Sequence, residues 1–170
     1  MDATELRALQ TPIKERYRAE PAAARITLRA AGTLDDARIA CKVETGRALA
    51  IAGLHPATGG TGLEACSGDM LLEALVACAG VTLKAVATAL EIPLRSARIS
   101  AEGDLDFRGT LGVAKDVAVG FTAIRLAFDL DADAPAERLD QLVEFTERYC
   151  VVYQTLRAGV PVSLRIGANR

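Results

Sequence analysis

The sequence predicts an α+β protein in which antiparallel sheets pack around one long buried helix. The stretch Ser67–Leu90 is almost wholly apolar, and shorter stretches on either side of it alternate apolar and polar residues. A helix that is apolar on all sides is typical of a protein interior, whereas a period of two indicates a half-buried strand. Strands and helices follow one another as strands, long helix, strands, two helices and a strand, an order that favours the α+β class.

Length and composition predict one domain and exclude some functions. The chain has 170 residues, which we divide into an N-terminal helical arm at residues 1–23 and a main domain at residues 24–170. A net charge of −2 gives no basic footprint for nucleic acid, and 4% aromatic residues provide few stacking platforms. The N-terminus lacks a basic stretch followed by an apolar one, so we expect a cytoplasmic protein.

The chain before the long helix predicts an arm and a three-stranded meander. In the arm we expect one or two helical turns on each side of Pro12. Alternating residues then predict strands at Ala24–Ala31, Ala37–Thr45 and Arg47–Ala52, joined by short turns. Residues 53–66 form a glycine-rich loop whose GGTG lacks the lysine and hydroxyl residue of a phosphate-binding loop.

The long helix has recognisable ends. Ser67 can cap its first turn, Asp69 suits the positive end of the helix dipole, and Pro93 follows its last residue. About 20 apolar residues could also span a bilayer. Glu73 and Lys84 would then lie inside the membrane, where charge is costly. We therefore expect the buried helix of a soluble protein with no membrane partner.

Five elements are expected after the long helix. They are strands at Ala97–Phe107 and Phe121–Asp129, an amphipathic helix at Glu137–Tyr149, a short helix from Val151 closed by Gly159, and a last strand at Val160–Ile166. Residues 108–120 are rich in glycine and small side chains and predict a loop. Pro135 is placed for the first position of the amphipathic helix.

The four cysteines are Cys41, Cys66, Cys78 and Cys150, and none of them forms a CxxC motif. Because the one histidine, His55, has no second ligand near it in sequence, we expect no metal site and no cofactor. Free cysteines in a reducing compartment are mostly small buried hydrophobes. A redox pair of Cys78 with Cys150 is one of six possible pairings of the four.

Cys78 needs help to become a reactive thiolate. It lies about ten residues inside the long helix, beyond the reach of that helix's own dipole, and burial raises the pKa of a thiol. A cation, best an arginine, would lower it. Asp69 and Glu73 lie on preceding turns of the same helix and could hold such an arginine in place.

Several segments together carry a resemblance to a known family. The run DMLLEALVAC followed by AGVTLKAVA resembles the central-helix signature of the OsmC/Ohr family of thiol peroxidases. The later ERYCVVYQTLRAGVPV is similar to the family's second cysteine segment, and HPATGGTG to its glycine-rich entry loop. Gly46 and Arg47 resemble the family's GR turn. The match is closer to the OsmC-like branch than to the Ohr branch.

This resemblance implies an intertwined α+β homodimer that reduces small organic hydroperoxides at the subunit interface. By position, Cys78 would be the peroxidatic cysteine and Cys150 the resolving one, with an external dithiol as reductant. Asp69 would replace the glutamate that anchors the activating arginine, and Arg47 would be that arginine. The alternatives to Arg47 are Arg25, Arg29 and Arg38.

The sequence also departs from the family pattern. Ser67 replaces the proline before the acidic residue, and Val151 replaces the proline after the second cysteine. Our leading hypothesis is a cysteine-based peroxidase without metal or organic cofactor. The alternatives are a non-enzymatic protein of the same fold that binds a small apolar ligand, and a purely structural interaction module.

Overall fold

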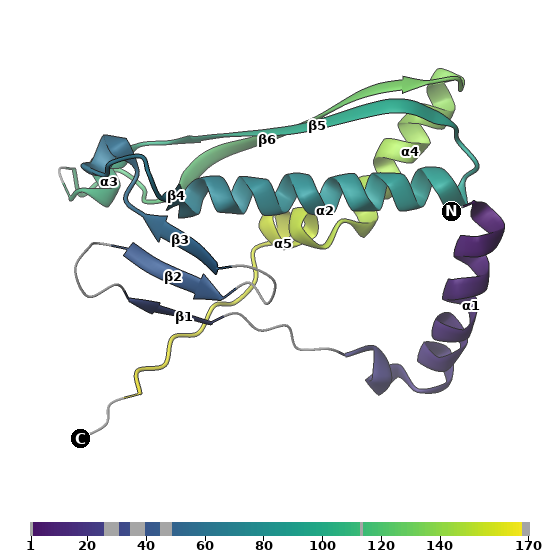
Figure 1. Ribbon diagram of the computed structural model, residues 1–170, viewed down its shortest axis with the longest axis horizontal. Helices are drawn as coiled ribbons and strands as arrows, with labels where there is room; N and C mark the ends of the chain where they lie inside the picture. The colour runs from purple at the N-terminus through teal and green to yellow at the C-terminus, as the bar shows by residue number, and fades with distance from the viewer. Residues whose placement is uncertain (1, 26–30, 35–39, 45–48, 113, 168–170) are drawn as a thin grey trace.

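The computed structural model describes residues 2–25, 31–34, 40–44, 49–112 and 114–167 (Figure 1). Its helices are α1 (Ala3–Ala19), α2 (Ser67–Ala89), α3 (Phe107–Thr110), α4 (Ala136–Tyr149) and α5 (Val151–Ala158), with 3₁₀ turns at Pro21–Ala24 and Pro56–Thr58. Its strands are β1 (Ala31–Leu34), β2 (Ala40–Glu44), β3 (Leu49–Gly53), β4 (Ala65–Cys66), β5 (Leu94–Leu105) and β6 (Phe121–Ala132). The predicted α+β class is confirmed.

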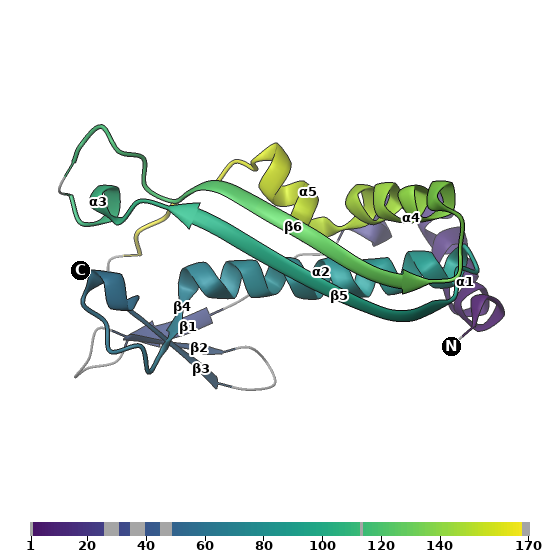
Figure 2. The ribbon, with the colours of Figure 1, turned by 90° about the horizontal axis from the view of Figure 1, so that it is seen from above.

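The strands form two separate sheets. In the first, β1, β2 and β3 make the predicted antiparallel meander, and β4 adds to β3 in parallel. In the second, β5 and β6 form a long antiparallel ribbon. The ribbon runs along α2, whereas the four-stranded sheet lies near the end where α2 begins (Figures 1 and 2). Helices α4 and α5 also pack on α2, so α2 is the centre of the fold.

One stripe of α2 is buried. Its fully buried residues are spaced four apart, as one helical face requires: Leu75, Ala79, Leu83 and Ala87. Leu83 and Ala87 belong to a core that also includes Leu142 of α4. Outside this stripe, the side chain of Val81 is 73% exposed. The buried central helix is confirmed, and, as expected for a single chain, the ribbon and two helices leave part of its apolar surface uncovered.

By length and composition alone, α2 could cross a membrane. In its most apolar 18-residue window, 28% of the residues are buried in the structure. A single helix of this kind is weak evidence, since the core helix of a soluble protein meets the same criteria. The soluble protein expected from Glu73 and Lys84 stays a prediction.

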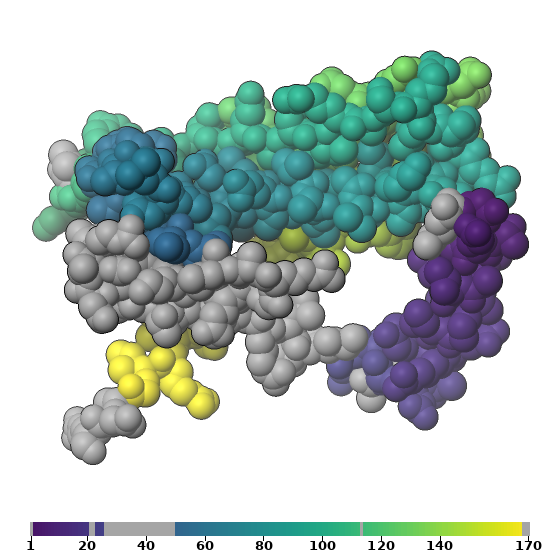
Figure 3. Space-filling model, in the orientation of Figure 1, coloured from purple at the N-terminus to yellow at the C-terminus, as the bar shows by residue number. Residues whose placement is uncertain are grey.

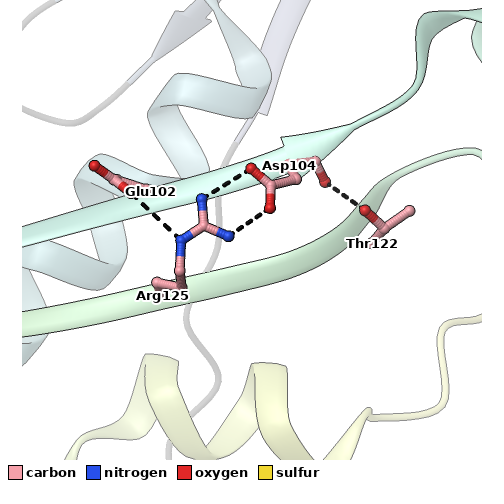
Figure 4. A network of polar contacts seen from close by, with 4 residues as sticks. All are labelled: Glu102, Asp104, Thr122 and Arg125. Atoms are coloured by element: carbon pink, nitrogen blue, oxygen red, sulfur yellow. Dashed lines mark hydrogen bonds and ion pairs between the residues drawn. The ribbon is translucent and has the colours of Figure 1, made fainter.

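An ionic network holds the register of the ribbon on its exposed face (Figure 4). The Arg125 guanidinium donates two hydrogen bonds to the Asp104 carboxylate, one of them 2.8 Å long, and a third of 3.3 Å to Glu102. The Thr122 hydroxyl donates to the Asp104 carbonyl oxygen at 3.1 Å. The hydrogen bonds from Arg125 lower the pKa of Asp104. Because these groups are exposed, dissolved salt weakens the attraction between their charges. The network therefore serves to position β5 against β6.

Helix α1 differs from the expected arm because it continues through Pro12. Its start is a capping box, in which Asp2 accepts the Glu5 N–H at 2.8 Å and Glu5 accepts the Asp2 N–H at 2.9 Å. The Thr11 hydroxyl also donates to the Arg7 carbonyl oxygen at 2.8 Å. Capping and local hydrogen bonds thus accompany a helix that a proline alone would be expected to interrupt.

Four other expectations need correction. A 3₁₀ turn ends at Ala24, where the first strand was expected to begin, and residues 26–30 lie outside the described part. Helix α3 lies in the expected loop. Cys66, not Ser67, is the N-cap of α2, and it makes no side-chain capping bond. Residues 160–166 form no strand and are exposed, because no strand edge of the described chain pairs with them.

Candidate active site

Two helical elements bring Cys78 and Cys150 together. Cys78 lies in the middle of α2 and is partly buried, whereas Cys150 is 1% exposed. Cys150 is the single residue between two helices, being both the C-cap of α4 and the N-cap of α5. Its extended backbone, with φ −75° and ψ 109°, turns the chain at this point. Both thiols are free in the structure.

Buried contacts fix the position of Cys150. Thr146 is fully buried on α4, and its hydroxyl donates to the Leu142 carbonyl oxygen at 2.7 Å. The Cys150 N–H donates to the Thr146 carbonyl oxygen at 2.9 Å. Across the turn, the Gln154 side chain donates to the Glu147 carbonyl oxygen at 2.8 Å and ties α5 to α4. The thiol of Cys150 is therefore held against α2 by the packing of α4.

The first turn of α5 offers free backbone donors to both sulfur atoms. The first hydrogen bond within this helix runs from the Gln154 N–H to the Cys150 carbonyl oxygen, at 3.0 Å. The three preceding N–H groups have no partner inside the helix. The Val151 and Val152 N–H groups lower the pKa of Cys78, and the Val152 and Tyr153 N–H groups lower that of Cys150. The Cys150 side chain itself forms no capping hydrogen bond to α5.

The pKa of Cys78 lies below the ordinary thiol value. Burial, the largest single influence, acts to raise it. The Val152 N–H, the Cys150 thiol, the Val151 N–H and the Thr82 hydroxyl act in the other direction and together outweigh burial. The Thr82 contribution is the smallest. The Thr82 hydroxyl also donates to the Cys78 carbonyl oxygen at 2.8 Å. Hydrogen bonds therefore favour the Cys78 thiolate.

The pKa of Cys150 moves the opposite way. Burial raises it most, and the neighbouring Cys78 raises it further, through the hydrogen bond and through its charge. The Tyr153 and Val152 N–H groups oppose this rise without cancelling it. The structure therefore distinguishes the two cysteines: the pKa of Cys78 is lowered and the pKa of Cys150 is raised.

The expected activating cation is not among the groups that act on Cys78 in the described residues. Arg47, Arg29 and Arg38 lie outside the described part of the chain, and Arg25 is exposed. From the sequence, Cys78 was expected to lie too far from any helix N-terminus, because only the dipole of α2 was considered. The N-terminus of α5 supplies the donors instead. The sequence signal for it was a cysteine directly before a helix start.

Asp69 does not share the side of α2 that carries Cys78. The two residues are nine positions apart, which corresponds to about 180° around a helix. Asp69 is exposed and borders two clefts on the other side of α2, one of them with Glu73. In the described part of a single chain, the carboxylates of Asp69 and Glu73 are therefore not placed to hold an arginine against Cys78.

Two cavities flank the cysteine pair along α2. One, of about 340 Å³, is lined by apolar residues of β6, by Leu75 one turn before Cys78, and by Tyr153 and Arg157 of α5. The other, of about 510 Å³, lies between α1 and α2 and is lined by Thr82 one turn after Cys78 and by Tyr149. Along α2, Cys78 thus lies between a residue that lines one cavity and a residue that lines the other.

His55 and Cys66 border a separate cleft of about 350 Å³. The His55 ring accepts the Ala57 N–H through Nδ1 at 3.0 Å and stacks on Phe107 at 4.9 Å, so it shapes the turn before α2. No group of three or more possible metal ligands occurs among the residues that the structure describes. Cys41 lies in β2, outside the region where side chains are described.

The fold and this site define a class: an α+β protein whose central helix carries a cysteine of lowered pKa beside a second cysteine at the junction of two helices. A profile of the family described as OsmC-like protein matches residues 60–165, well over half of the chain. The chain belongs to the OsmC-like family. No curated protein sequence matches it significantly.

Solved structures agree on the fold. An OsmC-like protein from Mycoplasma pneumoniae superposes with a TM-score of 0.65 at 16% identity, covering 79% of this chain and 89% of that one. An organic hydroperoxide resistance protein from Elizabethkingia anophelis gives 0.63 at 15% identity, covering 80% and 91%. An OsmC-like protein of unknown function from Vibrio cholerae gives 0.61 at 14%, covering 77% and 94%. At such identities the likeness establishes the fold alone.

Proposed function

We propose that this protein is a thiol-dependent hydroperoxide reductase that uses Cys78 and Cys150. One observation carries the proposal: the fold brings two free cysteines together, Cys78 on α2 and Cys150 between α4 and α5, and their pKa values move in opposite directions. A nucleophilic cysteine must be a thiolate, whereas the cysteine that resolves its sulfenic acid can remain a thiol until then. Family membership and the hydroperoxide resistance proteins among the structural neighbours support the same reading.

The chemistry proceeds in three steps. The Cys78 thiolate attacks the terminal oxygen of a hydroperoxide, the O–O bond breaks, and its electron pair leaves with the alkoxide, which takes up a proton to become an alcohol. Cys78 is oxidised to a sulfenic acid. The Cys150 sulfur then attacks the Cys78 sulfur, a disulfide forms, and water leaves. An external dithiol reduces the disulfide and is itself oxidised to a disulfide, which returns both thiols.

The substrate of this reaction is a small organic hydroperoxide. The cavity between α1 and α2 is lined mainly by apolar groups, and a hydrocarbon chain gains about 0.8 kcal/mol for each methylene that it buries. Hydrogen peroxide has no methylene groups and therefore does not gain this binding free energy. The proposed dithiol reductant and the free thiols suit the reducing cytoplasm.

The protein works as a homodimer in this proposal. Val162, Leu164 and Ile166 alternate with polar residues and are 91%, 86% and 83% exposed. Figure 3 shows the C-terminal segment projecting from the body of the molecule. An extended segment with alternating apolar residues is suited to pairing with the sheet edge of a second copy. The exposed part of α2 around Val81 would also be covered in such a dimer.

Steady-state turnover tests the proposed function. Purified protein, an excess of dithiothreitol and cumene hydroperoxide should consume the hydroperoxide continuously and yield one alcohol for each peroxide. Cys66→Ser serves as the matched control, since Cys66 borders another cleft and should leave the rate unchanged. No consumption above that of dithiothreitol alone would refute the peroxidase. A co-purified apolar ligand, found by mass spectrometry, would then favour the binding protein.

A further inference from the structure

The cleft of about 350 Å³ at the start of α2 has no role in the proposed peroxidase reaction. Its lining comes from five elements, namely the 3₁₀ turn before α2, α2 itself, β5, β6 and α3. Two of the chain's four phenylalanines, Phe107 and Phe121, line it together with the one histidine, His55. In a chain with so few aromatic residues, this concentration of rings and a volume in the range of ligand pockets indicate a binding site.

The aromatic walls of the cleft are held in place. The His55 ring stacks on Phe107, with 4.9 Å between the ring centroids and 24° between the planes. The same ring accepts a backbone N–H of its own turn through Nδ1 at 3.0 Å. On another wall, a Cβ at Gly103 would overlap the Phe121 ring, and a Cβ at Gly68 would lie 3.5 Å from it. The missing side chains thus let this ring lie close to the backbone of β5 and of α2.

The charge that faces the cleft is negative. Asp69 and Asp104 line it, and no lysine or arginine does. The Asp104 carboxylate is paired with Arg125 on the ribbon (Figure 4). Arg108, on the nearby helix α3, is itself paired with Asp106. Among the ion pairs of the residues that the structure describes, none involves Asp69, so its carboxylate remains available to a ligand.

We propose that this cleft binds a small organic ammonium ion with an apolar body. A cation is attracted both to the faces of aromatic rings and to a carboxylate. Leu72 and Leu105 also line the cleft and can cover the hydrocarbon part of such a ligand. A metal ion fits less well, because no group of three or more possible metal ligands occurs in the described part of the chain. This inference goes beyond the peroxidase and does not depend on it.

Three probes that share a phenyl ring and differ in charge test the proposal on the wild-type chain: benzylammonium, benzyl alcohol and benzoate. In ¹⁵N–¹H spectra, benzylammonium should shift the amide signals of Gly68 and Gly103 in a saturable way. Benzyl alcohol should bind at least about fivefold more weakly, because it lacks the charge. Benzoate should cause no saturable shift. Equal affinities for the ammonium and the alcohol, or no saturation with benzylammonium, would overturn the proposal.

A pair of matched variants tests the carboxylate. Asp69→Asn should weaken benzylammonium binding about two- to tenfold, because it removes the charge that faces the ligand. Glu73→Gln removes the same charge one turn later on α2, where the side chain lines the neighbouring cleft, and should leave the affinity unchanged. Both side chains are exposed, so neither change disturbs the core. Equal affinities in the two variants would contradict the role of Asp69 and with it the proposed site.

Discussion

The Cys150 thiol donates a hydrogen bond to the sulfur of Cys78, across the contact between α5 and α2. The direction of this bond makes the pair unequal before any substrate arrives. It favours charge on the partly buried sulfur and keeps the proton on the fully buried one. That asymmetry supports the proposed roles, attack by Cys78 and resolution by Cys150.

Substitution of each cysteine should therefore give a different result. Cys78→Ser should abolish turnover, because a serine hydroxyl does not reduce a peroxide. Cys150→Ser should still react once, accumulate a sulfenic acid at Cys78 that a dimedone probe captures, and then overoxidise. Intact-mass spectra after a single addition of hydroperoxide distinguish these outcomes. Full activity in Cys78→Ser would end the proposed assignment.

The hydrogen bond from Cys150 should itself be measurable in the pH dependence of Cys78. Cys150→Ala removes the donor, whereas Cys150→Ser keeps a hydroxyl that can donate. The alkylation midpoint of Cys78 should rise in the alanine variant and remain nearer the wild-type value in the serine variant. If the two variants share one midpoint, the Cys150 side chain does not stabilise the thiolate.

Stability should also depend on pH through Cys78. Its pKa is lower in the folded chain than in the unfolded one, so deprotonation favours folding. This stabilisation is fully present above the pKa of an unfolded thiol and is lost as the pH falls through the folded pKa. The free energy of unfolding of wild type relative to Cys78→Ser, from urea titrations, should therefore grow as the pH rises through this window. A difference independent of pH would contradict the lowered pKa.

Substrate size should affect kcat/KM. Each methylene buried in a flanking cavity adds about 0.8 kcal/mol, or roughly a fourfold gain, until the cavity is filled. A homologous series from ethyl to hexyl hydroperoxide, measured against hydrogen peroxide, should therefore show a rising kcat/KM. Leu75→Asp, which places a charge in the wall of one cavity, should flatten the rise if that cavity holds the chain. A series with equal values throughout would exclude an apolar subsite.

The C-terminal segment should matter for assembly rather than for folding of the core. Wild type should behave as a dimer at micromolar concentration in light scattering. A chain truncated after Gly159 should remain folded by circular dichroism but dissociate more readily, because it lacks the exposed Val162, Leu164 and Ile166. A wild-type mass of 17.9 kDa would refute the dimer. A truncated chain that dimerises equally well would exclude the segment as its basis.

Much of the fold could be predicted because its central elements carry strong local signals. Helix α2 is a long apolar run, β5 and β6 alternate clearly, and α4 has an apolar stripe. The errors concern segments whose structure depends on partners. Pro12 marks a break that the helix α1 does not make, and residues 160–166 alternate like a strand but find no edge to pair with in the described chain.

The candidate site, too, could be predicted only in part. The resemblance identified Cys78 and Cys150 as the reactive pair, and the structure brings them together. It does not bring Asp69 to Cys78, because nine positions along a helix lead to the opposite side. The backbone donors of Val151 and Val152 were missed because an N–H group is common to nearly every residue. Only the relative placement of α2 and α5 shows which N–H groups meet a sulfur.

One measurement tests the central claim most directly. Reduced protein is treated anaerobically with one equivalent of cumene hydroperoxide, and its disulfides are mapped by non-reducing peptide mass spectrometry. The account predicts the loss of two of the four thiols of each chain, joined as a Cys78–Cys150 disulfide, with one cumyl alcohol released. Unchanged thiols, or a disulfide that joins Cys41 or Cys66 in place of this pair, would contradict it.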